Sequence, residues 1–206
     1  MAAPAPFRLL TALALASCAS AACGRSQPVE AGFWFEPVTF QSKVIDGAVT
    51  TADLTAIEAI ARAELKQAFR GLPIVISARR DATFRIRVVK EVRDQRFRGN
   101  WGVAGETFAV PGLGGQSNVS FLFLASGAVA MSPATATRDE VLQAIGRGIG
   151  RTAAHELAHA LLPQAPIHDS TDIRSYEFDS AARREQFYGE MHWALARPWL
   201  EERLRR

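Results

Sequence analysis

Residues 137–162, TRDEVLQAIGRGIGRTAAHELAHALL, decide the fold because they predict one long helix. Thr137 and Glu140 have the spacing of a capping box, in which the hydroxyl caps the helix and the carboxylate bonds back to the first amide. Pro163 stops the pattern. Between these ends, apolar residues recur at helical spacing, at Val141, Leu142, Ile145 and Ile149.

Three glycines interrupt this helix, at Gly146, Gly148 and Gly150. Each weakens a helix by about 1 kcal/mol relative to alanine. We therefore interpret them as places where a neighbouring strand or helix comes close.

The segments around the long helix predict strands and two further helices. Residues 50–70 predict a helix that Thr50 or Thr51 caps and Gly71 ends. Residues 180–204 predict a last helix with a bend or break before Pro198. The strands are predicted at 32–40, 72–77, 82–92, 101–110 and 118–124, with a loop at 111–115. This order predicts an α/β (α+β) fold, in which a mixed twisted sheet packs on the long helix and a C-terminal helix follows.

The N-terminus has the pattern of an exported lipoprotein. Arg8 precedes an apolar run at 9–16, as in a secretory signal. Residues 15–18 (LASC) resemble the lipobox of bacterial lipoproteins, which implies a signal peptide at 1–17 and a lipid on Cys18. Cys23 is the second candidate. We interpret 18–31 as a tether, and the chain length predicts one domain at 32–206. The resemblance implies anchoring on the extracytoplasmic side of a bacterial membrane.

Composition narrows the function classes. Of 206 residues, 48 % are hydrophobic and 22 % charged, which excludes wholesale disorder. The net charge is +3, and the arginines at 79–98 are interleaved with acidic residues, so we expect no nucleic-acid partner. The two cysteines lie at 18 and 23, so the predicted domain has no disulfide and no thiolate metal site. The sequence does not indicate the oligomeric state.

Residues 155–159, HELAH, carry the candidate chemistry. Side chains four apart on a helix are offset by about 40°, so His155 and His159 can reach one metal ion. Glu156 projects in a neighbouring direction, where a general base beside a metal-bound water belongs. A chance match to HExxH occurs in about one chain in two hundred of this length. We therefore predict a Zn²⁺ site.

Together with the element order, this motif resembles the zincin metallopeptidases, and within them the metzincins. Metzincins have a glycine and a third histidine after HExxH, where this sequence has Leu162 and Ala165. His168 is the nearest substitute, and it is our predicted third ligand. Arg174 stands where the metzincin turn has methionine, whereas Tyr176 has a suitable place to reach the metal.

Other residues remain candidates for the third metal ligand. Thr171, Asp172 and Tyr176 match the spacing of the aspzincins, in which the aspartate is the ligand. Asp169 is a further candidate. A glutamate from the last predicted helix, such as Glu185 or Glu190, is another, as in the gluzincins.

The resemblance implies a zinc-dependent hydrolase, most simply a peptidase acting on peptides or proteins. Glu156 would activate the attacking water, and Tyr176 would donate to the oxyanion. The strand at 118–124 would pair with an extended substrate. A zinc enzyme acting on a non-peptide amide or ester fits the same motif. The alternative from another class is a non-catalytic envelope lipoprotein that keeps the fold for a structural or binding role.

Overall fold

The computed structural model describes residues 28–93, 102–110, 114–162, 184–190 and 196–205. Five strands form one sheet in the order β4-β1-β5-β9-β8. The first four are parallel, and β8 runs antiparallel to β9, so the sheet is mixed, as predicted. The strands are β1 (Val29–Phe35), β4 (Ile74–Ser77), β5 (Phe84–Val89), β8 (Gly105–Val110) and β9 (Gly114–Ser120).

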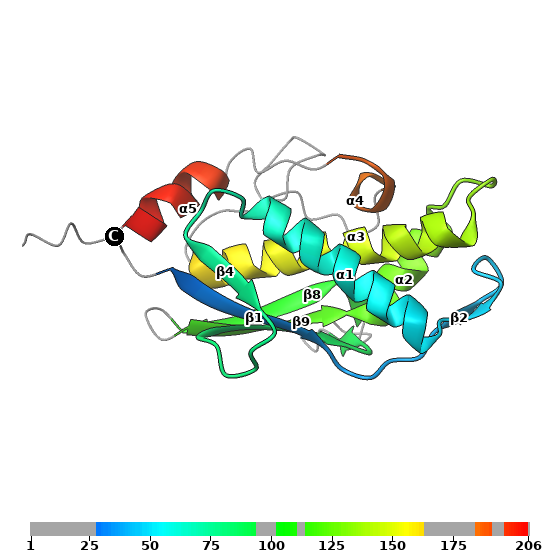
Figure 1. Ribbon diagram of the computed structural model, residues 1–206, viewed down its shortest axis with the longest axis horizontal. Helices are drawn as coiled ribbons and strands as arrows, with labels where there is room; N and C mark the ends of the chain where they lie inside the picture. Colours follow the sequence, from blue (N-terminus) through cyan, green and yellow to red (C-terminus); the bar gives the residue numbers. More distant parts are fainter. Residues whose placement is uncertain (1–27, 94–101, 111–113, 163–183, 191–195, 206) are drawn as a thin grey trace, which may run out of the picture.

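Helices cover one face of this sheet. Figure 1 shows α1 and α3 crossing it together, and the two helices contact each other along their length. The helices are α1 (Thr51–Ala68), α2 (Phe121–Ala130), α3 (Arg138–Leu161), α4 (Arg184–Tyr188) and α5 (Ala196–Arg205). Two short strand pairs lie outside the sheet, β2 (Gln41–Ser42) with β3 (Gly47–Ala48), and β6 (Val92–Arg93) with β7 (Gly102–Val103).

The predicted caps of both long helices are confirmed. The Asp53 carboxylate accepts from the Thr50 amide at 2.7 Å, and the Thr50 hydroxyl accepts from the Asp53 amide at 3.2 Å. The Thr50 hydrogen bonds hold the pKa of Asp53 below its ordinary value. Thr137 and Glu140 form the same capping box at the start of α3, with the same effect on the pKa of Glu140. These caps fix where both helices begin.

The three glycines of α3 mark close contacts, as predicted. A Cβ on Gly150 would lie 2.4 Å from the carbonyl oxygen of Ala61 on α1, and one on Gly146 would lie 2.7 Å from the Cβ of Ile60. A Cβ on Gly148 would lie 2.5 Å from the ring of Phe187. Glycine therefore lets α1 and α4 approach the α3 backbone. This close packing offsets the low helix propensity of glycine.

The two faces of the sheet differ in polarity, as the alternation in 82–92 predicts. Ile86 and Val88 of β5 are fully buried on the helix face, whereas Arg87 points to the other face. There the Arg87 guanidinium donates to the Asn118 side chain at 3.1 Å, and Asn118 donates to Glu106 at 2.9 Å. One polar network therefore links three strands on the face opposite the helices.

The predicted strand at 118–124 is wrong in its second half. The chain changes from β9 to α2 at Ser120, whose hydroxyl accepts from the Phe123 amide at 3.3 Å. An apolar run of this length fits a buried strand or a buried helix, and the serine cap decides for the helix. β9 instead begins at Gly114, inside the predicted loop at 111–115. Because β9 pairs with β5 and β8, it cannot also pair with a substrate.

The predicted helix at 180–204, with a bend or break before Pro198, is confirmed only in part, because Gly189 and Glu190 are not helical. The structure has the five-residue α4, and then α5 begins at Ala196. Pro198 lies in the first turn of α5, where a missing amide costs no hydrogen bond. In the described part of the chain, no helix has the length and apolar character needed to cross a membrane.

Candidate functional site

The two motif histidines lie on the last two turns of α3 and converge. The Nε2 atoms of His155 and His159 are 3.0 Å apart. Their rings meet edge to face, with centroids 4.6 Å apart and an interplanar angle of 87°. Both side chains are partly exposed, whereas the intervening Leu157 and Ala158 are buried against the core. The helix therefore presents both imidazoles at one place while its other face packs.

This geometry fits a zinc ion. Zinc at about 2.0–2.1 Å from two imidazole nitrogens in tetrahedral geometry sets those nitrogens about 3.4 Å apart. The observed 3.0 Å is close to that value, and small side-chain rotations cover the difference. His155 and His159 are thus suited to act as two ligands of one ion.

Glu156 is a residue of α3, and its side chain lies against strand β8. Its side chain is buried, with 6 % of its surface exposed. The Thr107 hydroxyl lies 2.5 Å from Oε2 of Glu156 and 3.0 Å from its backbone oxygen. The Thr107 hydroxyl also lies 2.9 Å from the hydroxyl of Ser117 on β9. The edge of the sheet thus holds the carboxylate.

Gly105 makes room for this carboxylate. A Cβ at that position would lie 2.5 Å from Oε1 of Glu156 and 2.9 Å from its Cγ. Because residues two apart in a strand share a face, Gly105 and Thr107 both face α3. One position therefore provides space, and the other a hydroxyl.

The remaining predicted site residues divide into two groups. His168, Asp169, Asp172 and Tyr176 lie outside the described residues. Glu185 and Glu190 are described, but the structure does not bring either glutamate to the two histidines. Across the described ranges, no group of three or more His, Cys, Asp or Glu side chains is arranged to hold a metal ion.

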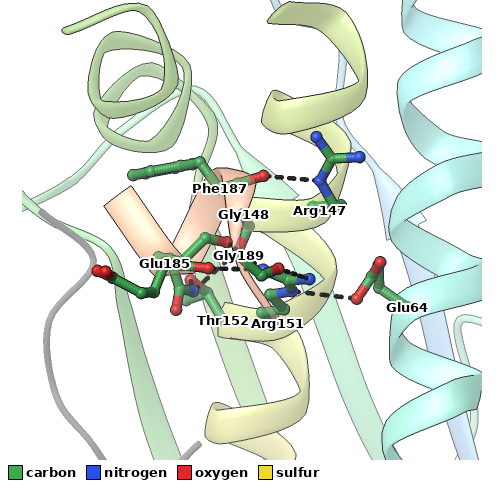
Figure 2. A network of polar contacts seen from close by, with 9 residues as sticks. Glu64, Arg147, Gly148, Arg151, Thr152, Glu185, Phe187 and Gly189 are labelled. Atoms are coloured by element: carbon green, nitrogen blue, oxygen red, sulfur yellow. Dashed lines mark hydrogen bonds and ion pairs between the residues drawn. The ribbon is translucent and has the colours of Figure 1, made fainter. Parts of the chain in front are cut away.

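A buried arginine, Arg151, connects α3 to residues 184–190. Arg151, one turn before His155, is 5 % exposed. It pairs with Glu64 of α1 at 3.1 Å and donates to three backbone oxygens of the α4 segment, residues 184–190. Figure 2 shows Arg151 between Glu64 on one side and the α4 segment on the other. The three acceptors are Glu185 at 2.8 Å, Gln186 at 3.0 Å and Gly189 at 2.9 Å.

Further contacts hold the same segment. Arg147 donates to the backbone oxygen of Phe187 at 2.6 Å, and Gln186 donates to the Thr152 hydroxyl at 3.2 Å. Burial, followed by the charge of Arg151, lowers the pKa of Arg147. Burial raises the pKa of Tyr188, whose hydroxyl donates to the Ala128 carbonyl at 2.8 Å. α4 is therefore fixed to both α3 and α2.

Sequence reasoning did not identify Gly105, Thr107, Ser117 or Arg151 as neighbours of the site. The strand containing Thr107 was predicted, but nothing in the sequence indicated which strand the motif glutamate would meet. One sequence signal could have identified Arg151. It is a charged residue among the apolar positions of a helix predicted to be buried, and a buried charge requires partners.

Comparisons with known proteins identify no relative. No model of a known protein family, no curated protein and no solved structure matches this chain.

Proposed function

We propose that this protein is a zinc-dependent hydrolase with a zincin-like, metzincin-related fold, and that its substrates are peptides or proteins. The observation that carries the proposal is the convergence of the His155 and His159 Nε2 atoms, 3.0 Å apart, on the helix turn that also carries the buried Glu156. A mixed sheet with an antiparallel edge strand under the motif helix supports it. His168 remains our proposed third ligand.

Bound zinc would supply a Lewis acid that polarises a carbonyl and lowers the pKa of a coordinated water toward about 7. Glu156 then accepts the proton of the attacking water and delivers it to the leaving amine. Tyr176 remains our proposed donor to the oxyanion. A non-catalytic binding protein would need the histidines at most, but not the carboxylate of Glu156 on the same helix turn.

The edge strand β8 is a better substrate site than the strand first predicted. It ends the sheet order, and within the described residues it pairs only with β9. An extended peptide can add to such an edge through backbone hydrogen bonds. Thr107 of β8 contacts Glu156, so a peptide on this edge would pass close to the proposed base.

Metal analysis tests the proposal directly. The purified mature protein should contain one zinc per chain, and His155→Ala should abolish stoichiometric zinc because one of three ligands is lost. The wild-type protein should hydrolyse casein, and a chelator should stop the reaction. A wild-type protein that retains no zinc after incubation with the metal contradicts the proposal.

The third ligand has its own test. His168→Ala should weaken zinc affinity strongly while Asp172→Ala leaves it near the wild-type value. The reverse result would assign the metal to Asp172, as in the aspzincins. The measurement is zinc affinity by competition with a chelator of known affinity.

We also propose that the protein is exported and anchored to the extracytoplasmic face of a membrane by a lipid on Cys18. Residues 1–27 lie outside the described part of the chain, so the sequence alone supports this step. Cys18→Ser should shift the protein from the membrane fraction to the soluble fraction or block its processing. A wild-type protein that is soluble and begins at a residue other than Cys18 or Cys23 contradicts it. Cys23→Ser is the matched control.

A further inference from the structure

The hydrogen bonds around Thr107 have a defined direction. The Thr107 hydroxyl has one proton, and an ionised carboxylate can only accept. The Thr107 hydroxyl has two acceptors on Glu156, Oε2 at 2.5 Å and the backbone oxygen at 3.0 Å, and it donates its proton to the nearer and charged one, Oε2. The hydroxyl of Ser117, which is 1 % exposed, is then the donor to Thr107 at 2.9 Å. The chain of donors therefore runs from β9 through β8 to Glu156.

The same strand constrains the other side of the carboxylate. Oε1 and Cγ of Glu156 lie over Gly105, where a Cβ would come within 2.5 Å and 2.9 Å of them. One oxygen thus receives a hydrogen bond, while the other occupies space that only glycine leaves open. A glutamate has three side-chain torsions, and contacts on both sides of its carboxylate limit them together.

We propose that Thr107, supported by Ser117, is a positioning residue that fixes the carboxylate of Glu156 for proton transfer. The inference rests on the proposed function. Thr107 acts through Glu156 and not on the substrate. Because proton transfer requires hydrogen-bond distance, a carboxylate free to rotate spends less time in the reactive position.

Substitution of the hydroxyl alone tests this role. Thr107→Val keeps the shape and removes the donor, whereas Thr107→Ser keeps the donor and removes a methyl group. With casein as substrate, Thr107→Val should lower kcat about 10- to 100-fold with KM and zinc content unchanged, since loss of position affects the chemical step. Thr107→Ser should restore most of kcat. Thr55→Val, an exposed threonine on α1, is the matched control.

Two results would overturn the proposal. In the first, Thr107→Val keeps the wild-type kcat. In the second, Thr107→Ser loses as much kcat as Thr107→Val, because the methyl packing and not the hydroxyl is then what matters.

A second measurement needs neither zinc nor activity. In zinc-free protein, Thr107→Val should lower the urea midpoint more in the wild-type background than in the Glu156→Ala background, because only the wild-type background has a buried carboxylate that loses the Thr107 hydrogen bond. Equal shifts would show no coupling and overturn the proposal. If the wild type is inert on casein while the coupling is present, the proposed function fails, yet Thr107 still holds Glu156. If hydrolysis occurs without coupling, the function stands and the positioning role fails.

Discussion

Glu156→Gln should lower casein hydrolysis by about 10²- to 10⁴-fold, the range typical of lost general acid–base catalysis. The amide has nearly the same shape as the carboxylate, but it cannot accept a proton at neutral pH. Its oxygen can still accept the hydrogen bond from Thr107, which lies 2.5 Å from Oε2 in the wild type. Zinc content and thermal unfolding should therefore stay near the wild-type values. Hydrolysis rate, zinc stoichiometry and Tm, measured on one preparation, check all three expectations.

The same variant separates an enzyme from a non-catalytic envelope protein. Loss of zinc in Glu156→Gln would mean that Glu156 is itself a ligand, and the proposed arrangement would be wrong. Equal inactivity of the wild type and the variant over a broad peptide library, with zinc bound in both, would favour the non-catalytic role. Glu58→Gln on α1, whose carboxylate pairs with Arg62, is a control for the chemical change alone.

Arg151→Met should cause the largest loss of stability that this structure predicts. Methionine fills a similar volume, but it leaves Glu64 without its ion pair and removes a donor from three backbone oxygens of the α4 segment. Removing one partner from a buried charged network costs about 3–5 kcal/mol, and the partial exposure of Glu64 favours the lower end. At roughly 2–4 °C per kcal/mol for a domain of this size, Tm should fall by roughly 6–12 °C.

A surface arginine provides the comparison. Arg79 pairs with Asp81, but both side chains are more than half exposed. Arg79→Met should leave the thermal midpoint nearly unchanged, because exposed ion pairs contribute little. If Arg151→Met and Arg79→Met unfold at the same temperature, the network around Arg151 is not a determinant of stability. Arg151→Lys should fall between them, since one ammonium group cannot reach all four acceptors.

The long helices were predictable because their signals are local. A capping box needs four consecutive residues, so Thr137 and Glu140 fixed the start of α3 without any tertiary contact. At α1 the sequence offered Thr50 or Thr51 as the cap, and the structure selects Thr50, which forms a capping box with Asp53. The glycines of α3 were also readable, because an unfavourable residue in a strong helix needs a packing reason. The strand at 118–124 failed because an apolar run has the same composition in a buried strand and a buried helix.

The candidate site was predictable only in part, for a related reason. His155, Glu156 and His159 lie within five residues, and helical geometry alone places the two imidazoles together. Which side chains meet Glu156 depends on the position of β8 at the edge of the sheet. That position follows from the pairing of β8 with β9, which no single segment encodes.

The sequence by itself determined the α3 helix, its caps, and the presence of two imidazoles and a carboxylate on one of its turns. These features depend on residues no more than a few positions apart, where covalent geometry and backbone hydrogen bonding decide the outcome. Only the tertiary structure decided that Thr107 donates to Glu156, that Gly105 leaves space for it, and that Arg151 joins α1 to α4. These contacts join residues 34 to 87 positions apart, and they form because burial of the shared core brings their elements together.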